Sequence, residues 1–533
     1  MAGVKPVAFA ALSAVLFAAA LPNEVANYGV PALGLVALIP LYAALREANE
    51  MRVALWVGGV YGALSTVLSN YWLANFGELA VWTLGGPTVA YAVYNMLLAA
   101  VLRTLMRLPD RLRPPAFAAA WTGYELLKSI GYLGHPWGLA AYSFGGVLRM
   151  QQIADITGVY GLSFVIVYAN AVLAEIALYG ASLRVRESKP RRVAAAALRA
   201  RPIRCLVPAI ALFTAIAVYG EFQLTQRRAP VDEIRAVLVQ QNTDSWRPGN
   251  LDAAVSVLQR LSAAALADGE HDLLVWSENS LSLPYREHRG EFYAQHPQPV
   301  PLTEFIASLE VPLLTGSPYL PREFPEEVWN AVVLIEPGTG DLLERYGKRR
   351  LVPFAEHIPL WEFAPVRTFF RNVVGLRTVW SRADETVLFE VPTRQGSAKA
   401  GVPISFEGAF APLTRDFTRA GAQLLINMTN NSWSQTESAQ YQQFVVTRFR
   451  AIEARRPLLL ATISGLTSAV DITGEKLVAL PMFEEGALEA TAPIYESSSF
   501  TVYHRIGDLF AWLMVATTVL LTVKAAPKRP GAA

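Results

Sequence analysis

Hydrophobic residues are distributed very unevenly along this chain. Up to about residue 224 the sequence is a series of long apolar stretches, after which ordinary soluble composition takes over until a last apolar run near residue 506. Most stretches reach the roughly 17 to 25 residues that about 30 Å of hydrocarbon demands, and the first two are short. We therefore predict a multi-pass α-helical membrane bundle of about eight spans: Pro6–Leu21, Val30–Leu45, Val53–Leu73, Leu79–Leu102, Ala116–Tyr132, Ile153–Leu178, Leu206–Phe222 and Ile506–Val523.

Composition supports a membrane protein that carries one globular domain. A length of 533 residues is too great for one compact core, and a mean hydropathy of +0.29 with 17% charged residues is too apolar for two soluble domains. We predict a membrane bundle over residues 1–227, an extramembrane domain over 228–503, and a last transmembrane helix with a cytoplasmic tail over 504–533.

Lysine and arginine predict the orientation, because cytoplasmic loops retain positive charge during insertion. They cluster after the second, fourth and sixth predicted spans, most densely over 184–204, whereas the turns at 22–29 and 74–78 carry none. Lys5 and the Lys524, Lys528, Arg529 tail agree with this alternation, so the first span is predicted to be an uncleaved anchor. Both termini are then cytoplasmic, and the globular domain lies outside the inner membrane.

Several kinds of site are disfavoured by the residues present. The single thiol, Cys205, starts the seventh span, so it makes no intramolecular disulfide and is not the reactive group of the exterior domain. The six histidines lack metal-binding spacing, and there is no phosphate-binding glycine loop. The basic loop at 184–204 is better read as a topology signal and anionic-lipid contact than as a nucleic-acid site. We predict no metal, no cofactor and no nucleic-acid partner.

The exterior domain alternates strand-like and helix-like runs, with more strands than helices. This pattern predicts an α/β sandwich of two sheets face to face with helices outside them. The predicted helices are Leu251–Ala267 and Ser438–Arg455, and a last hairpin turns at 471–475. The predicted strands are Ile234–Gln240, Asp272–Trp276, Pro312–Thr315, Ala331–Glu336, Leu342–Tyr346, Ala400–Ile404 and Leu424–Met428.

Three polar residues follow apolar strand-like runs in this domain. Glu278 ends the run Leu273–Trp276, Lys348 follows the strand Leu342–Tyr346, and Ser405 stands in Pro-Ile-Ser-Phe-Glu. Alone, each has an ordinary reading: a solvated loop acid, a basic surface loop and a strand-end serine. Together, an acid, an ammonium and a hydroxyl at strand ends are the set that moves an acyl group.

The order of the motifs carries a resemblance to a known family. They are Gly134-His135-Pro136-Trp137, Trp246, Trp276-Ser277-Glu278, Tyr346-Gly347-Lys348, Leu351 to Glu356, the Ser405 run, Asn430 to Trp433, and Tyr503 to Asp508. The chain resembles apolipoprotein N-acyltransferase, a membrane-embedded branch of the nitrilase (carbon–nitrogen hydrolase) superfamily, over nearly its whole length. The resemblance implies a membrane bundle with a nitrilase-like αββα domain. It also implies transfer of an acyl chain from a phospholipid to the α-amine of diacylglyceryl cysteine.

Roles follow from the resemblance position by position. Glu278 matches the general base, Lys348 the oxyanion stabiliser and Ser405 the nucleophile position. Glu356 and Glu407 match supporting acids, whereas Trp246, Trp137 and Gly134 match positions concerned with substrate. The implied partners are a phospholipid acyl donor, a diacylated prolipoprotein acceptor and membrane lipids. The implied location is the bacterial inner membrane, and we expect a monomer.

One residue departs from the family pattern in a way that bears on activity. The family has cysteine where Ser405 stands, and a hydroxyl is a far weaker acid than a thiol. Three explanations fit: a serine enzyme with an adapted site, a cysteine that was replaced to silence the enzyme, and a homologue that has lost catalysis. Two rival functions follow, a membrane-tethered amidase or nitrilase that passes the acyl group to water, and a non-catalytic lipid-binding homologue.

Within the bundle, Glu125 and Lys128 stand three apart on one predicted helix. Ionisable groups inside a membrane are costly unless they are paired or face a polar cavity. The spacing favours an internal ion pair, with a role at a phospholipid headgroup as the alternative.

Overall fold

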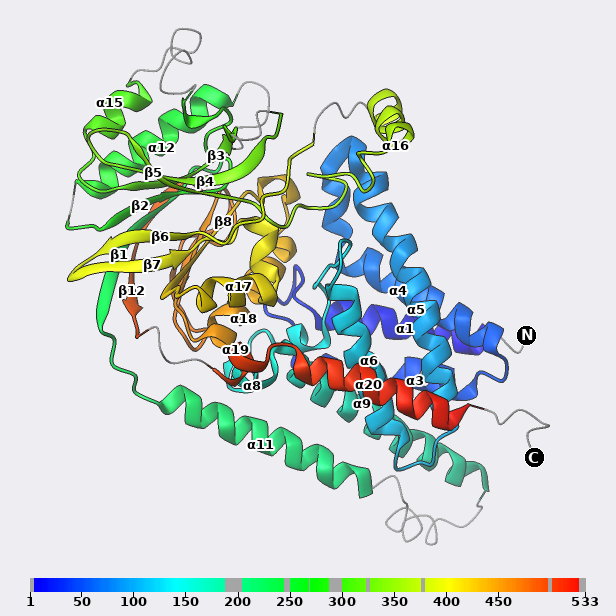
Figure 1. The fold of residues 1–533 in the computed structure, drawn as a ribbon. Coiled ribbons are helices and arrows are strands. Elements are labelled where there is room, and N and C mark those ends of the chain that lie inside the picture. Colours follow the sequence, from blue (N-terminus) through cyan, green and yellow to red (C-terminus); the bar gives the residue numbers. More distant parts are fainter. Residues whose placement is uncertain are drawn as a thin grey trace. The chain divides into compact units, whose positions relative to one another are not determined.

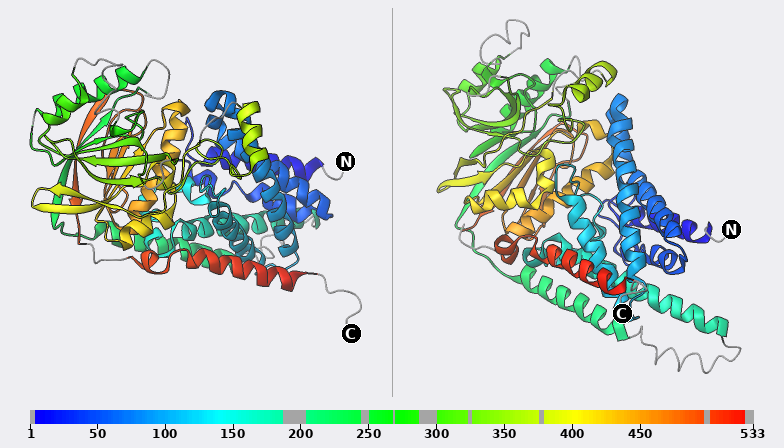
Figure 2. Two further views of the ribbon diagram at one scale, coloured as in Figure 1. Left: turned by 45° about the horizontal axis from the view of Figure 1, so that its top comes forward. Right: turned by 45° about the vertical axis from the view of Figure 1, so that its right-hand side comes forward.

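The computed structural model describes residues 4–186, 204–243, 250–267, 269–286, 300–322, 326–374, 379–496 and 501–526 (Figures 1 and 2). Contacts within the chain divide it into two units. The helical unit comprises Met1–Ala74, Ala80–Gln226 and Ile506–Ala533, and the sheet unit comprises Asn75–Leu79 and Arg227–Arg505.

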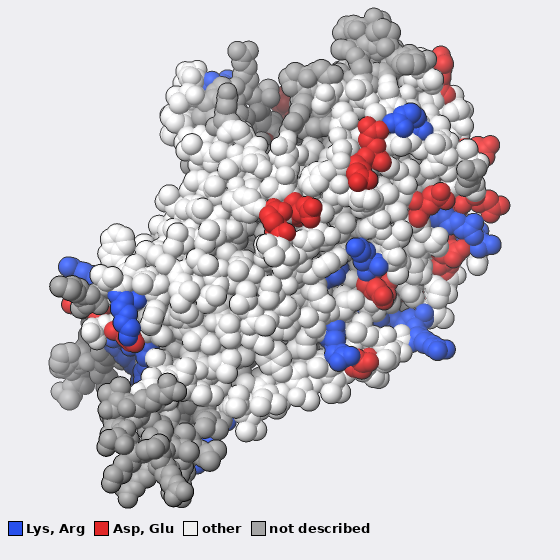
Figure 3. Space-filling model, turned by 180° about the vertical axis from the view of Figure 1, so that it is seen from behind, with Lys and Arg blue, Asp and Glu red and all other residues white. Residues whose placement is uncertain are grey.

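Long apolar helices make up the helical unit. Among the described residues, four segments are long and apolar enough to cross a membrane: Met51–Ser69, Val81–Leu105, Val159–Ala181 and Leu206–Thr225. Figure 3 shows a broad area of the surface with few charged side chains, which suits contact with lipid. These helices confirm a multi-pass helical region, while the count of about eight spans stays a prediction. The main helices are α1 (Val4–Ala20), α4 (Met51–Ser69), α5 (Gly86–Leu105), α6 (Arg113–Ser129), α9 (Val159–Arg186), α11 (Leu206–Thr225) and α20 (Leu509–Ala525).

The second predicted span is not one continuous helix. The chain forms α2 (Pro31–Gly34) and α3 (Ile39–Glu47) with a break between them. Pro40, near the start of α3, has no N–H to donate to the preceding turn, so a continuous helix is disfavoured. Asn170 of α9 satisfies the break, since its side-chain oxygen accepts from the Leu38 N–H at 2.9 Å and its amide donates to the last carbonyl of α2 at 2.8 Å.

The sixth predicted span is also interrupted near its start. A short helix, α8 (Ala154–Thr157), precedes α9, and Gly158 between them has a φ of 64°. That left-handed conformation favours glycine and ends the first helix.

Two six-stranded sheets form the sheet unit, in the orders β12-β1-β2-β3-β4-β5 and β11-β10-β9-β8-β7-β6. The central strands β1, β2 and β3 of the first sheet are parallel, as are β7, β8 and β9 of the second. The first sheet contains β1 (Asp232–Gln240), β2 (Leu273–Trp276), β3 (Leu313–Tyr319), β4 (Trp329–Ile335), β5 (Leu342–Gly347) and β12 (Gly486–Ile494). The second contains β6 (Leu388–Thr393), β7 (Gly396–Gly401), β8 (Leu424–Thr429), β9 (Leu458–Thr462), β10 (Ser468–Val470) and β11 (Lys476–Ala479).

Strand alternation explains how the layers are built. In β1, Ile234, Ala236 and Leu238 point into the core between the sheets, whereas Val237 and Val239 point to the outer face. Each large aliphatic side chain buried in this way contributes about 1.5–3 kcal/mol. Helices cover both outer faces in Figure 1, which confirms the αββα sandwich. They are α12 (Leu251–Leu266) and α15 (Leu302–Ala307) on the first sheet, and α17 (Ala411–Arg419) and α18 (Glu437–Ala454) on the second.

Most predicted strands agree with the structure within a few residues, with one clear exception. The strand expected over Ala400–Ile404 ends at Gly401, because Pro403 has no N–H with which to continue the ladder. Ile404 makes only an isolated parallel bridge to Met428. The polar run that follows β7 is therefore a turn rather than a strand end.

Candidate active site

Glu278 lies just past the carboxyl end of β2, where the sequence predicts a functional acid. The four residues of β2 are buried, and the Glu278 side chain is itself buried, with 3% of the residue exposed. Its backbone rests directly on β3 at Gly316, where a Cβ atom would lie 2.7 Å from the Glu278 Cα. The missing side chain of Gly316 therefore lets this carboxylate approach the neighbouring strand.

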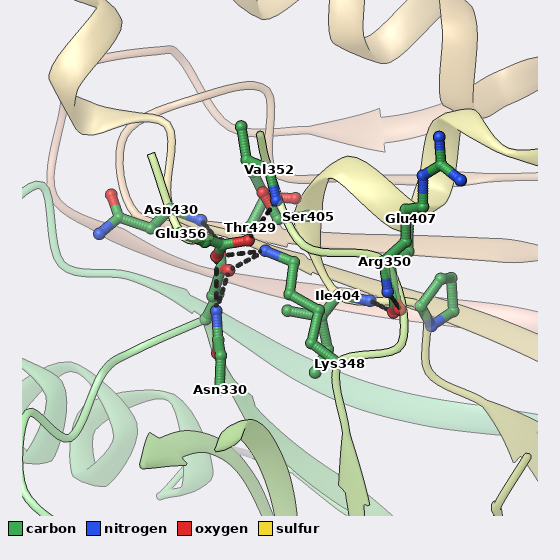
Figure 4. A network of polar contacts seen from close by, with 12 residues as sticks. Asn330, Lys348, Arg350, Val352, Glu356, Ile404, Ser405, Glu407, Thr429 and Asn430 are labelled. Atoms are coloured by element: carbon green, nitrogen blue, oxygen red, sulfur yellow. Dashed lines mark hydrogen bonds and ion pairs between the residues drawn. The ribbon is translucent and has the colours of Figure 1, made fainter. Parts of the chain in front are cut away.

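Lys348 follows β5 and its ammonium lies between two carboxylates (Figure 4). Its Nζ donates to Glu278 Oε1 at 2.9 Å and to Glu356 Oε1 at 2.7 Å, and the residue is 1% exposed. Burial alone would lower the pKa of Lys348, but the charges of the two glutamates outweigh it and raise that pKa above its usual value. The side chain is therefore a permanent cation at neutral pH and serves as a donor, not as a base.

Asn330 of β4 joins the same cluster, although the sequence analysis did not single it out. Its Nδ2 donates to Glu278 Oε1 at 2.8 Å and to Glu356 Oε1 at 3.0 Å (Figure 4). The second oxygen of Glu356 accepts the Val352 N–H at 2.8 Å. An amide inside an otherwise apolar, buried strand was the available signal, because such a group needs polar partners.

The second sheet supplies a further partner of Glu278. Its Oε2 accepts the backbone N–H of Asn430 at 2.7 Å, and Asn430 directly follows β8. Strand ends of both sheets thus hold one carboxylate from two sides. This fixes its orientation before any substrate binds.

Ser405 begins a short 3₁₀ helix, Ser405–Ala409, and is half-buried. Its φ is 50°, in the left-handed region that non-glycine residues seldom occupy. Asn427 of β8 holds this turn by donating to the carbonyls of Pro403 at 2.8 Å and of Ser405 at 3.3 Å. Backbone conformations of this kind cost about 1–3 kcal/mol and concentrate at active sites.

Glu407 ties the Ser405 turn to the Lys348 segment. Its Oε2 accepts the Ile404 N–H at 2.8 Å, and its Oε1 accepts the N–H groups of Arg349 at 2.6 Å and Arg350 at 2.9 Å (Figure 4). The Tyr346 hydroxyl donates to both oxygens, at 3.1 and 3.0 Å. Burial raises the pKa of Glu407, while these backbone donors and Lys348 act in the opposite direction. One fully buried carboxyl therefore sets the distance between the two segments.

The residues predicted to handle substrate are not part of the described sheet unit. Trp137 and Gly134 belong to the helical unit, in the loop after α6, where Trp137 is 7% exposed and its ring stacks on that of His135 at 4.9 Å. Trp246 lies outside the described residues. The structure thus gathers Glu278, Lys348, Glu356, Ser405 and Glu407 in the sheet unit, and the substrate roles of the other three stay predictions.

Comparison with known proteins agrees with this architecture. Residues 13–172 match the family model of the apolipoprotein N-acyltransferase N-terminal domain, and residues 235–496 match that of carbon–nitrogen hydrolases. Apolipoprotein N-acyltransferase 2 of Treponema denticola is 35% identical, covering 96% of this chain and 95% of the relative. The protein of the same name in Treponema pallidum is 33% identical (97% and 93%), and the Geobacter metallireducens apolipoprotein N-acyltransferase is 31% identical (97% and 94%). The chain therefore belongs to the apolipoprotein N-acyltransferase family.

Proposed function

We propose that this protein transfers a fatty acyl chain from a phospholipid to the N-terminal α-amine of a diacylglyceryl-cysteine apolipoprotein, through an acyl-enzyme on Ser405. The names of its relatives support lipoprotein N-acylation. The observation that carries the proposal is the buried Lys348 ammonium held between Glu278 and Glu356, with the Ser405 turn fastened to the same segment by Glu407.

In the first half-reaction the Ser405 Oγ attacks an ester carbonyl carbon of the phospholipid. Glu278 takes the hydroxyl proton as the Oγ–C bond forms, and then returns it to the glycerol oxygen as the ester bond breaks. Lys348 has three N–H donors, two of which bond to the glutamates. The third is available to donate to the carbonyl oxygen of the substrate ester, which becomes negative in the transition state. The products are a lysophospholipid and an acyl ester on Ser405.

In the second half-reaction the α-amine of the lipoprotein attacks the acyl ester. Glu278 accepts a proton from the attacking nitrogen and delivers it to the departing Ser405 oxygen, which restores the hydroxyl and leaves an amide. Both halves use the same oxyanion donor and the same carboxylate. Ping-pong kinetics follow, since the lysophospholipid leaves before the acceptor reacts.

The identity of the nucleophile sets the rate. A thiol has an ordinary pKa of about 8.5, whereas a hydroxyl is a much weaker acid, so Glu278 deprotonates serine far less readily. The acyl-enzyme is also an oxygen ester rather than a thioester. We expect slow turnover with Ser405 and a clear gain when this position carries a thiol.

The test compares the protein with Ser405→Cys and Ser405→Ala in detergent micelles that contain phospholipid and a diacylated lipopeptide. Mass spectrometry follows the triacylated lipopeptide, the acyl-enzyme and free fatty acid. Lipopeptide acylation that rises in Ser405→Cys and is absent from Ser405→Ala supports the proposal. Fatty acid released without an acceptor indicates an amidase or nitrilase that uses water. Failure of both Ser405 and Ser405→Cys to form an acyl-enzyme contradicts catalysis and favours a lipid-binding homologue.

We further propose that the sheet unit faces the extracytoplasmic side and that both termini are cytoplasmic. The alternation of Lys and Arg along the helical segments supports this orientation. In a Cys205→Ser background, a thiol introduced at the exposed Lys524 should resist a membrane-impermeant maleimide in intact cells, whereas one at the exposed Lys399 should react. The reverse pattern contradicts the assignment.

A further inference from the structure

Glu125 and Lys128 of α6 do not pair with each other in the described part of the chain, so the internal ion pair that their spacing favours is not formed. Glu125 Oε1 instead accepts from the Trp121 indole at 3.0 Å and from a backbone N–H at 2.7 Å. The Lys128 ammonium donates to the carbonyls of Trp137 at 2.7 Å and Gly138 at 3.3 Å. The two charges are therefore satisfied by different neighbours, and neither neutralises the other by contact.

The Lys128 ammonium keeps one donor for a further ligand. It has three N–H groups, of which two are used by the carbonyls. The rings of Tyr91 and Tyr124 lie 5.6 and 5.8 Å from Nζ and favour a cation there. Carbonyls and ring faces carry only partial charge, so within the described part of the chain this positive charge has no anion in contact. An anionic oxygen is the chemistry that completes this site.

Lys128 also lies at the wall of an apolar groove that opens on the outside of the bundle. The groove has a volume of about 450 Å³ and is formed where α20 lies alongside α5 and α6 (Figures 1 and 2). On α6 it extends from Ala120 to Lys128, which is about 12 Å along the helix axis and close to the depth of one leaflet, about 15 Å. Four of the residues that line it carry a polar group, namely Lys128, Tyr94, Tyr124 and Thr518, and the others are apolar, including Leu97, Val101, Leu127, Val515 and Val519.

We propose that this groove binds one phospholipid, with a phosphate oxygen on the Lys128 ammonium and an acyl chain along α5, α6 and α20. The Lys128 ammonium has one N–H donor available for an anionic headgroup. The apolar groove is about as long as one leaflet is deep, which suits one hydrocarbon chain. The site lies wholly within the helical unit and involves no reaction. The lipid bound here is a ligand and not the acyl donor that reacts at Ser405, and it fills the groove beside α20.

Native mass spectrometry of the full chain, purified in detergent, tests the headgroup contact. The probes are phosphatidylglycerol, diacylglycerol with the same chains, and inorganic phosphate. We expect one phosphatidylglycerol per chain, bound at least about tenfold more tightly than diacylglycerol, the scale of one charge-assisted hydrogen bond. Lys128→Gln should lose that preference, whereas Lys524→Gln, which removes an exposed charge at the end of α20, should keep it. Equal binding of the two lipids, or an unchanged preference in Lys128→Gln, overturns the proposal.

A second pair of variants tests the groove without touching the charge. Val519 lines the groove and Leu520 does not, and both are exposed on α20, at 58% and 71%. Val519→Trp should fill the groove and weaken phosphatidylglycerol binding by at least about tenfold, because several CH₂ groups of the acyl chain are then no longer buried. Leu520→Trp should leave binding unchanged. Equal effects of the two substitutions, or complete displacement of the lipid by equimolar inorganic phosphate, contradict a lipid site in this groove.

Discussion

Replacement of Lys348 by methionine removes the cation between Glu278 and Glu356 while keeping a side chain of similar length. In the native site the ammonium lies 2.9 Å from one carboxylate oxygen and 2.7 Å from the other, so those oxygens are at most about 5.6 Å apart. Both carboxylates are largely buried, with side-chain exposures of 4% and 14%. The variant therefore holds two like charges close together with only the Asn330 amide between them.

Coulomb's law gives the size of the effect. Two unit charges about 5.6 Å apart, with an effective dielectric constant of about 20, repel each other by about 3 kcal/mol. Binding of one proton to the pair removes this repulsion, so acid favours the folded variant. At neutral and higher pH, loss of one partner from a buried ion pair lowers stability by about 3–5 kcal/mol.

The pH dependence separates this explanation from a simple packing defect. A proton that the folded variant binds more tightly than its unfolded chain favours folding at low pH, and this contribution is lost as the pH rises. Thermal unfolding in detergent should therefore show a deficit relative to the native protein that is small near pH 5 and grows toward pH 8. Acyl transfer should fall by about 10²–10³-fold at every pH, because the oxyanion donor is gone.

Lys399→Met is the matched control, since Lys399 is exposed on β7 and its loss should change stability by no more than about 0.5 kcal/mol. A Lys348→Met deficit that is the same at pH 5 and pH 8 would refute the two-carboxylate argument. Retention of native acylation activity would refute the assignment of Lys348 as the oxyanion donor.

Three further substitutions test the surroundings of the site and of the bundle. Gly316→Ala places a Cβ only 2.3 Å from the backbone nitrogen of Asn279, next to Glu278, so Glu278 should shift and the acylation rate should fall by about a hundredfold. Gly396→Ala is the control, since a Cβ there meets nothing within 4 Å and the rate should equal the native one. Tyr346→Phe removes the hydroxyl that Glu407 accepts on both oxygens, so thermal unfolding should report a loss of about 1–2 kcal/mol, and an unchanged midpoint would contradict that contact. Asn170→Leu leaves the Leu38 N–H and the Gly34 carbonyl, between α2 and α3, without their Asn170 partner. This should destabilise the detergent-solubilised protein by about 2–4 kcal/mol, and native stability would show that these two groups find other hydrogen-bond partners.

The acid and the ammonium of the site could be predicted because each has a local signal. Glu278 follows a short buried strand, and Lys348 follows a strand whose last two residues are buried; functional groups of α/β folds gather at such strand ends. The break before α3 also had a local signal in Pro40, but the length of the apolar run outweighed it in the sequence analysis.

The parts that could not be predicted depend on partners far away in the sequence. Asn330 bridges carboxylates that lie 52 residues before it and 26 residues after it, and Asn170 completes a backbone break 132 residues away. Strand and helix periodicity indicate which face of an element a residue occupies, but they do not identify the polar group that will bond to it on that face. A buried amide in an apolar element signals that a partner exists, and only the three-dimensional structure identifies it.

The completeness of the site bears on the three explanations for Ser405. A buried cluster of two carboxylates and an ammonium adds little to stability, since well-packed apolar residues of similar volume serve as well or better. The left-handed conformation of Ser405 opposes folding by a further 1–3 kcal/mol or so. Yet Glu278, Lys348 and Glu356 are in contact, and the Glu407 connections to both segments are intact. Ser405→Cys separates the three explanations: a serine enzyme adapted to oxygen should gain little, an enzyme silenced at this position should recover by orders of magnitude, and a homologue that has lost catalysis should stay inactive.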